Sequence, residues 1–265
     1  MLQDFSLSII IEPLLDWFAG HARVLPWREE PTPYRVWVSE IMLQQTRVEA
    51  VKPYFERFTK ALPDIKALAE CEEEVLLKLW EGLGYYNRVR NMQLAAKAVM
   101  KEYGGQLPAD YHKLLTLPGI GHYTAGAIAS IAYRIPVPAV DGNVLRVISR
   151  VTADTSDIMK QSVRTAMEDA LFTIMPEDRA GAFNQALMEL GATVCLPNGA
   201  PLCTECPWKE FCQTRQQGRW DEIPVKSKAK PRKIEEKTVF VIRIGDQVVL
   251  NKRPPRGLLA GLYGF

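Results

Sequence analysis

The stretch "LPGIGHYTAGAIAS", Leu117–Ser130, places two glycines one residue apart immediately before a helical pattern. Glycine permits positive φ and close approach of another backbone. Amides around Gly119 and Gly121, together with the N-terminus of the following helix, can converge on an anion. We therefore predict a short helix at about 110–115, a tight turn, and a second helix from His122. The pair is either a phosphate clamp without basic side chains or an ordinary connection between helices.

Helical patterning extends from this stretch over most of the chain. Thr32 and Pro33 stand where an N-cap and a first helical residue belong, and another helical segment stops at Gly104–Gly105. Pro53 is expected near the start of a helix or at a kink. The connections are short, so the predicted fold class is all-α. The later helices are expected at about Gly142–Val151, Lys160–Ile174 and Gly181–Cys195.

Length and composition set outer limits on the function. The chain has 265 residues, of which 47% are apolar, which is enough for a full core and about two domains. The formal net charge is +2, so any nucleic acid must be bound by a local surface rather than by a bulk basic field. No apolar run has membrane-spanning length and no secretory signal is present. We therefore expect a cytoplasmic protein without a membrane partner.

The character of the sequence changes near the C-terminus. Val225–Lys237 is basic and nearly free of apolar residues, as linkers are. Thr238 begins strand-like sequence in which Gly245–Asp246 forms a turn between two β-branched runs. A two-stranded hairpin is marginal alone, so we expect the segment that ends at Phe265 to be the beginning of an incomplete second domain.

Four of the five cysteines fall within one short segment. Cys195, Cys203, Cys206 and Cys212 are separated by seven, two and five residues. In an intracellular chain such a group indicates a metal site before it indicates disulfides. A structural zinc site more often has two Cys-x-x-Cys pairs, whereas four thiolates in a compact loop also suit a cubane iron–sulfur cluster, which we favour. Cys71 is expected to be a small core residue.

Two carboxylates are candidates for acid–base chemistry. Glu40 has Val36, Trp37 and Leu43 at helical spacing around it, so burial should make it hold its proton more strongly. The alternative is a glutamate that faces solvent. Asp141 precedes a helix and is a good N-cap, although an N-cap can still present its second oxygen to a substrate.

Together these motifs resemble one family. The "LPGIG" turn with its following helix, the "VDGNV" segment and the cysteine loop are similar to the helix-hairpin-helix iron–sulfur DNA glycosylases. The segments "LPWR", "WVSEIMLQQT" and "GLGYYNR" narrow the resemblance to the adenine DNA glycosylases of the MutY type. The match covers about residues 5–220. The tail "NKRPPRGLLAGLYGF" resembles the start of that family's C-terminal domain, which has a NUDIX-like fold.

The resemblance implies a two-part core, with DNA between the parts and an adenine flipped into the cleft. Together with the composition of the C-terminal part, it predicts five segments. These are an N-terminal helix that packs with the cluster domain (1–24), a six-helix domain with the helix-hairpin-helix (25–131), the cluster domain (132–220), a basic linker (221–236) and the start of an incomplete NUDIX-like domain (237–265).

The catalytic residues implied by the resemblance are four. Glu40 matches the general acid that protonates N7 of adenine. Asp141 matches the carboxylate that stabilises the sugar oxocarbenium ion, or traps it, before water adds. Tyr123 and Asn143 match residues of the catalytic pocket.

The resemblance also implies the residues that contact DNA and bind the cofactor. The adenine pocket is lined by Arg23, Trp27, Arg28 and Gln185. The duplex around the opposite 8-oxoguanine is contacted by Gln45, Thr46, Leu83 and Tyr85, and the backbone by Gly119 and Gly121. A [4Fe-4S] cluster is held by Cys195, Cys203, Cys206 and Cys212. Without the resemblance, Leu83 and Tyr85 are interpreted as core residues that anchor a loop.

The implied activity is that of a monofunctional DNA glycosylase in base excision repair. Its expected partner is double-stranded DNA that contains A:8-oxoguanine or A:G mispairs, and the expected state is a monomer. The alternative enzyme is an endonuclease III-like glycosylase and lyase on damaged pyrimidines, which should carry a lysine at the position of Tyr123. Two further hypotheses are a non-enzymatic iron–sulfur DNA-binding module and a helical protein with a zinc loop.

Overall fold

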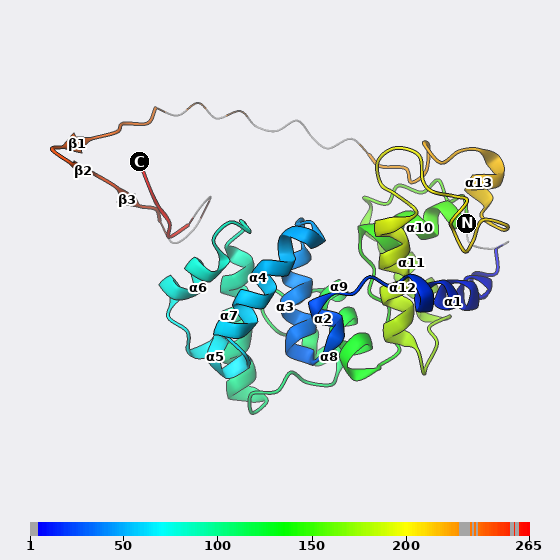
Figure 1. Cartoon of the computed structure of the whole chain (residues 1–265), viewed down its shortest axis with the longest axis horizontal. Helices are drawn as coiled ribbons and strands as arrows, with labels where there is room; N and C mark the ends of the chain where they lie inside the picture. Colours follow the sequence, from blue (N-terminus) through cyan, green and yellow to red (C-terminus); the bar gives the residue numbers. More distant parts are fainter. Residues whose placement is uncertain (1–4, 228–233, 235, 237, 255–256, 258–259) are drawn as a thin grey trace. The chain divides into compact units, whose positions relative to one another are not determined.

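The structure is a computed structural model that describes residues 5–227, 234, 236, 238–254, 257 and 260–265. The chain divides into two compact units, Met1–Ser227 and Lys228–Phe265. The described part of the first unit is helical, and the described part of the second contains short strands (Figure 1). Among the described residues, none of the helices combines the length and the apolar character needed to cross a membrane.

The helices of the first unit are short and follow one another closely (Figure 1). After a 3₁₀ turn at Leu7–Ile10, they are α1 (Ile11–His21), α2 (Pro26–Glu29), α3 (Pro33–Leu43), α4 (Val48–Ala61), α5 (Ile65–Glu70), α6 (Glu73–Trp80), α7 (Asn87–Glu102), α8 (Tyr111–Leu115), α9 (His122–Ala127), the π-helical turn η2 (Ile128–Ala132), α10 (Gly142–Val151), α11 (Gln161–Phe172), α12 (Ala180–Thr193) and α13 (Gln213–Gln217).

The helix termini follow the local sequence signals. Thr32 caps α3 because its hydroxyl accepts a hydrogen bond from the amide of Arg35, and Pro33 is the first helical residue. α10 begins after Asp141 and ends at Val151, which confirms the predicted bounds. Pro53 lies inside α4, five residues after its start at Val48.

Two hydrophobic clusters form the core of the first unit. One contains buried residues from Leu25 to Val137 and includes the fully buried Trp37 and Trp80. The other combines buried residues of α1 with buried residues between Val140 and Trp208. The helix α1 packs against α12, so the start of the chain belongs to the second cluster although α2 and α3 belong to the first.

The quoted stretch forms the predicted pair of helices, α8 and α9. Gly119 has a φ of 76°, and a Cβ atom there would lie 2.7 Å from the Cβ of Asn91. Both the backbone conformation and the close approach of α7 therefore require glycine at this position. Gly121 is the N-cap of α9, with a φ of −95°.

The chain crosses from the first cluster to the second between η2 and α10. Asn184 of α12 fixes this crossing because its side chain accepts a hydrogen bond from the amide of Ala139 and donates to the carbonyl of Val137, at 3.0 and 2.9 Å. Its amide also donates to the Ser130 hydroxyl at 2.8 Å. The segment that leads into Asp141 is consequently held on both sides.

The second unit contains two antiparallel strand pairs in its described residues. β1 (Arg243–Ile244) pairs with β2 (Gln247–Val248), which confirms the predicted turn at Gly245–Asp246. β3 (Asn251–Lys252) pairs with β4 (Tyr263–Gly264). Residues 228–233 and 235 of the predicted basic linker lie outside the described residues. The five-segment division and the NUDIX-like character of this unit stay predictions.

Candidate active site

A cavity of about 670 Å³ in the first unit brings together many of the predicted site residues. Its walls come from both hydrophobic clusters. The predicted residues that line it are Glu40, Asp141, Tyr123, Asn143, Arg23, Trp27, Arg28, Gln185, Gln45 and Thr46. The structure therefore brings predicted catalytic, pocket and DNA-contacting residues from three parts of the chain to one cavity.

Glu40 lies on the buried face of α3 and is 6% exposed. Burial raises its pKa to about 7, the charge of Asp141 acts in the same direction, and the Tyr123 hydrogen bond and the Arg28 charge act against it. The expectation that Glu40 is enclosed and holds its proton more strongly is thus confirmed. Near neutral pH a substantial fraction of the molecules has a proton on this carboxyl group, as a general acid requires.

Tyr123 is the second residue of α9, two positions beyond Gly121. Its phenol donates a hydrogen bond to the Oε2 atom of Glu40 and lies 3.5 Å from the sulfur of Met188. Burial and the charge of Glu40 raise the pKa of Tyr123 well above its ordinary value. The phenol therefore stays protonated, and the hairpin turn delivers a permanent hydrogen-bond donor to Glu40.

Asp141 is the N-cap of α10 and faces the same cavity. Its Oδ1 atom accepts hydrogen bonds from the amides of Asn143 and Val144, both at 2.8 Å. The Asn143 side chain donates to Oδ2 at 2.7 Å. Burial raises the pKa of Asp141, whereas these three hydrogen bonds favour the carboxylate. The result is a fixed carboxylate with both oxygens oriented by α10.

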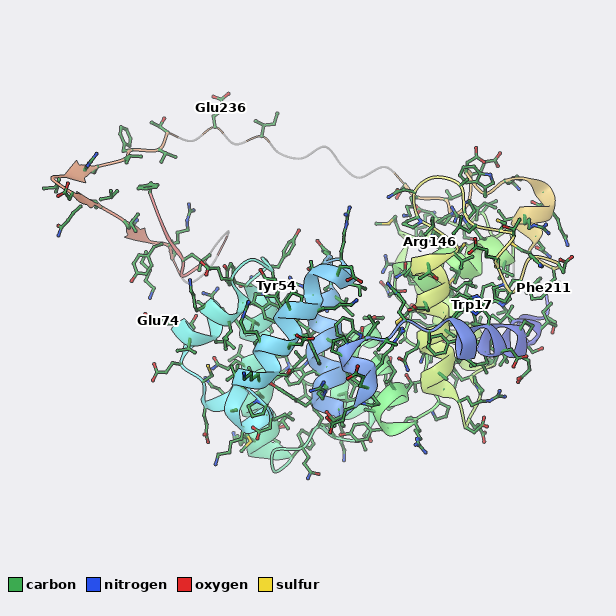
Figure 2. All side chains as sticks on the ribbon, in the orientation of Figure 1. Trp17, Tyr54, Glu74, Arg146, Phe211 and Glu236 are labelled. Carbon is green, nitrogen blue, oxygen red and sulfur yellow. The ribbon has the colours of Figure 1, made fainter. Side chains whose placement is uncertain are left out.

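Arg146 connects this carboxylate to the cysteine segment, and sequence reasoning missed it. The residue is labelled in Figure 2 and is 5% exposed. Its Nη2 atom donates to the side-chain oxygen of Asn143 at 2.8 Å and to the carbonyl of Gly191 at 2.7 Å. Its Nε atom donates to the carbonyl of Cys195 at 2.9 Å. The orientation of Asn143, and through it of Asp141, thus depends on a buried guanidinium.

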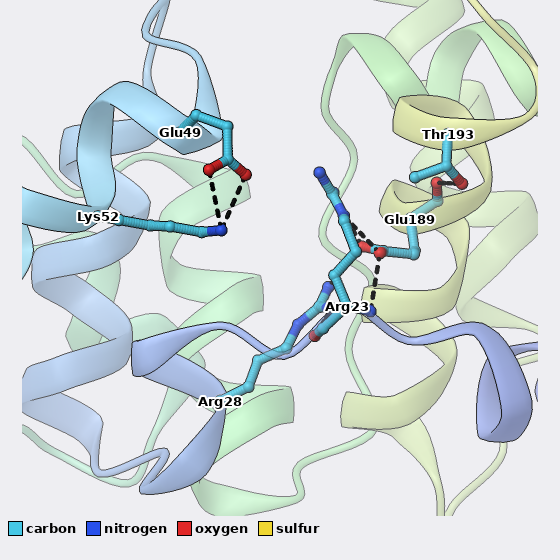
Figure 3. Close-up of polar contacts among 6 residues, drawn as sticks. All are labelled: Arg23, Arg28, Glu49, Lys52, Glu189 and Thr193. Carbon is cyan, nitrogen blue, oxygen red and sulfur yellow. Dashed lines mark hydrogen bonds and ion pairs between the residues drawn. The ribbon is translucent and has the colours of Figure 1, made fainter.

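Two arginines and a buried glutamate form another part of the cavity wall, and Figure 3 shows their contacts. Glu189 is 1% exposed; its Oε1 accepts from Nε of Arg23 at 2.6 Å, and its Oε2 accepts from Nη2 of Arg28 at 2.9 Å. Burial opposes ionisation of Glu189, but the two guanidiniums outweigh it, and its pKa is below the ordinary value. Glu189 was not predicted, although it lies one helical turn after Gln185 on the same face of α12.

Across from Arg23, α4 carries a second, more exposed ion pair (Figure 3). Nζ of Lys52 lies 2.8 Å from Oε1 of Glu49, whose side chain is 76% exposed. Exposed pairs of this kind contribute little to stability. Glu49 is therefore a suitable control for Glu189, because its charge also acts on Arg23 although its side chain is exposed.

Four predicted DNA-contacting residues lie outside the walls of this cavity. Leu83 is 7% exposed and packs in the first hydrophobic cluster, whereas Tyr85 is 66% exposed. The prediction that Leu83 and Tyr85 are core residues thus agrees with the burial of Leu83 but not with the exposure of Tyr85. Gly119 and Gly121 lie in the turn between α8 and α9. The roles predicted for all four stay predictions.

The four clustered cysteines line a separate cavity beside α10 and α12. Burial raises the pKa of the Cys206 thiol to about 12, and the other three cysteines add to the effect. Four neighbouring thiols therefore resist losing their protons, because each thiolate would repel the next. A bound metal cation would favour the thiolates, which are the form that ligates metals. Among the residues that the structure describes, no three His, Cys, Asp or Glu form a group placed to hold a single metal ion. All four cysteines nevertheless line one cavity.

The comparisons with known proteins agree with one another. Residues 38–171 match the model of the HhH-GPD superfamily base excision DNA repair protein. The chain is 38% identical to an adenine DNA glycosylase of Buchnera aphidicola subsp. Acyrthosiphon pisum (strain APS), over 97% of this chain and 73% of that protein. It is 37% identical to the adenine DNA glycosylase of Homo sapiens, over 95% of this chain. The chain spans 56% of the length of that human relative.

Solved structures show the same fold. A thermostable thymine-DNA glycosylase superposes with a TM-score of 0.73 at 24% identity, over 82% of this chain and 100% of that one. A trapped endonuclease III–DNA covalent intermediate superposes with a TM-score of 0.66 at 24% identity, over 81% of this chain and 99% of that one. At this identity the likeness concerns the fold alone.

Proposed function

Because the chain belongs to the HhH-GPD superfamily of base excision DNA repair proteins, and within it to the adenine DNA glycosylases, we propose that it removes adenine from DNA by hydrolysing the N-glycosidic bond. The proposed substrate is double-stranded DNA with adenine opposite 8-oxoguanine or guanine. The observation that carries the proposal is that Glu40, with a pKa of about 7, and Asp141 line one cavity.

The proposed reaction begins with an adenine rotated out of the duplex into this cavity. Glu40 donates its proton to N7, so the bond between C1′ and the base breaks with the electron pair on a neutral leaving group. Asp141 stabilises the positive charge that develops on the sugar, or forms a bond to C1′. A water oxygen then adds to C1′, displacing the Asp141 oxygen where that bond has formed, and gives its proton to the Glu40 carboxylate left by the first step, which leaves an abasic site.

The surrounding residues have proposed roles in holding this arrangement. Tyr123 donates to Glu40 and Asn143 donates to Asp141, so each carboxylate has its own neutral partner. Trp27, Arg28 and Gln185 form the sides of the cavity where the base would lie. Gln45 and Thr46 line the same cavity after the end of α3, where the duplex would enter.

The alternative enzyme, a glycosylase with lyase activity, requires an amine that attacks C1′. Tyr123 occupies the position where that reading expects a lysine, and a phenol cannot form a Schiff base. We therefore propose a monofunctional enzyme that leaves the strand intact. Borohydride trapping on substrate DNA tests this point: covalent trapping of the unsubstituted chain overturns the monofunctional assignment.

The proposed cofactor is a [4Fe-4S] cluster held by Cys195, Cys203, Cys206 and Cys212. When bound, the cluster links the four thiolates and so braces the segment around them. Arg150 supports this segment because it donates to the sulfur of Cys195 at 3.4 Å and to the carbonyl of Leu196 at 2.9 Å. Elemental analysis should find about four iron atoms and four sulfides per chain. Stoichiometric zinc without iron after anaerobic purification decides for the zinc loop.

The function as a whole is tested by three duplexes, which contain A:8-oxoguanine, A:G and oxidised thymine. We expect release of adenine from the first two under single-turnover conditions and no release from the third. Release of the oxidised thymine alone assigns the chain to the alternative enzyme. Binding to all three duplexes without any base release assigns it to the non-enzymatic module.

A further inference from the structure

Arg88, in the first turn of α7, closes the C-terminal end of α3. Its Nη1 atom donates to the carbonyls of Ile41 and Gln44 at 2.8 and 2.7 Å, and to that of Met42 at 3.3 Å. The last carbonyls of a helix have no partner within the helix, and a positive charge is favourable at that end. The arginine therefore fixes the point at which the chain leaves α3.

The other arm of the same guanidinium holds the loop between α6 and α7. Its Nη2 atom donates to the carbonyls of Leu83 and Gly84, at 3.0 and 3.2 Å. The guanidinium carbon lies 5.5 Å from the centre of the Tyr85 ring and 5.4 Å from that of Trp80. One half-buried side chain thus bonds two segments that are about forty residues apart in the sequence.

Each of these two segments contains a strained residue directly after a carbonyl that Arg88 binds. Gln45 has a φ of 59° and Tyr85 has a φ of 48°. Side chains other than glycine rarely adopt the left-handed region, and such a conformation persists where the surroundings fix it. The hydrogen bonds from Arg88 to Gln44 and Gly84 supply that constraint on both sides.

The two strained residues are also the ones that present exposed side chains. Gln45 is exposed at the wall of the cavity, and the Tyr85 side chain is 66% exposed. Arg88 itself does not line the cavity, and its hydrogen bonds go to backbone carbonyls rather than to the Glu40 carboxyl group. Arg88 thus bonds the backbone directly before both Gln45 and Tyr85, although it is not itself one of the residues around the cavity.

We propose that Arg88 is a positioning residue that sets the end of α3 and the α6–α7 loop against each other, so that Gln45 and Tyr85 engage the base opposite the excised adenine together. This inference rests on the proposed function and extends it to opposite-base selection. Arginine suits the role because its planar fork reaches acceptors in two directions, whereas lysine is a point charge.

The test compares Arg88→Met, Arg88→Lys and a matched control, Arg90→Met. Arg90 lies on the same helix, and its side chain makes an ion pair with Glu73 of α6 at 2.9 Å. The measurement is the single-turnover rate of adenine release from A:8-oxoguanine and A:G duplexes at saturating enzyme. For Arg88→Met we expect the ratio of the two rates to fall about tenfold, which is less than the roughly hundredfold cost that a 1 Å misplacement can have. The ratio for Arg88→Lys should lie between those of the unsubstituted chain and Arg88→Met. Arg90→Met should have the ratio of the unsubstituted chain.

A mutant cycle separates positioning from general stability. If Arg88 acts through the two exposed residues, Arg88→Met should change the ratio little further in a chain that already carries Gln45→Ala and Tyr85→Ala. An unchanged ratio in folded Arg88→Met overturns the proposal, as does full additivity in the cycle. Arg88→Lys answers the same question if Arg88→Met does not fold. If the unsubstituted chain releases no adenine from either duplex, the proposed function fails first; release with a ratio insensitive to Arg88 rejects this inference alone.

Discussion

The two walls of the cavity each contain a buried glutamate, and they treat its charge in opposite ways. Glu40, on α3, has a neutral phenol as its hydrogen-bond partner, and burial raises its pKa to about 7. Glu189, on α12, is also buried, but two guanidiniums hold its pKa below the ordinary value. Burial alone does not decide the protonation state; the partner does. One wall is thereby suited to deliver a proton and the other to keep a fixed charge pair.

The largest effect is expected from Glu40→Gln. The amide keeps the shape of the side chain and can still accept from Tyr123, but it has no proton to deliver. Adenine release should fall by about 10²–10⁴-fold, the usual range for general acid catalysis. Single-turnover assays measure the loss, and a DNA-binding assay should show affinity close to that of the unsubstituted chain. Near-normal release would remove Glu40 from the mechanism.

The same two glutamates should affect folding stability with opposite signs. The pKa of Glu40 is raised from its ordinary 4.5 to about 7, so its stabilisation is fully present below pH 4.5 and is lost as the pH rises toward 7. The change in unfolding free energy caused by Glu40→Gln should therefore be more stabilising at pH 8 than at pH 5, by up to about 3 kcal/mol. The measurement is the free energy of unfolding in urea at both pH values.

Glu189→Gln should do the reverse at pH 8. The pKa of Glu189 is lowered, so its stabilisation is present above the ordinary pKa of 4.5 and is lost as the pH falls through the folded value. Loss of the carboxylate leaves two partly buried guanidiniums unpaired, and we expect a destabilisation of about 2–3 kcal/mol. Glu49→Gln is the control, because its exposed pair with Lys52 should change stability by less than about 1 kcal/mol. Equal effects of the two substitutions would remove the contrast between the walls.

Features that depend on residues close together in the sequence could be predicted from the sequence alone. The caps at Thr32 and Asp141, the bounds of α10 and the helical hairpin were predictable because their signals lie within a few residues. The burial of Glu40 followed from apolar residues one helical turn away. The predicted all-α helix-hairpin-helix class and the family are confirmed by the comparisons.

Contacts between distant segments could not be predicted in the same way. The Tyr123–Glu40 hydrogen bond joins residues 83 positions apart. Arg88 and Arg146 were missed because most of their acceptors are backbone carbonyls, which leave no trace in residue type. Glu189 was missed because its partners, Arg23 and Arg28, are more than 160 positions away. The spacing from Gln185 shows only that it shares a helix face, not which charges it meets.

A smaller effect, on the pH dependence of catalysis, is expected from Glu189→Gln. Arg28 lowers the pKa of Glu40, and Glu189 partly neutralises Arg28. With the carboxylate removed, the free positive charge should lower the pKa of Glu40 further. The alkaline limb of the rate profile should move to lower pH, and the rate at pH 8 should fall, by about tenfold for each pKa unit of that shift. Glu49→Gln should leave the limb in place.

The smallest effect is expected from Tyr123→Phe, and its direction is the most specific test of the Glu40 wall. The phenol donates to the ionised carboxyl group, so its removal deletes an interaction that lowers the pKa of Glu40. Burial then acts with less opposition, and the pKa should rise. The alkaline limb should move to higher pH, opposite to the shift for Glu189→Gln, while the rate below pH 7 should fall only a few-fold because the acid is still present. The measurement is the single-turnover rate from pH 6 to pH 9 for both variants. Shifts in the same direction would show that the two walls do not act on one titrating group.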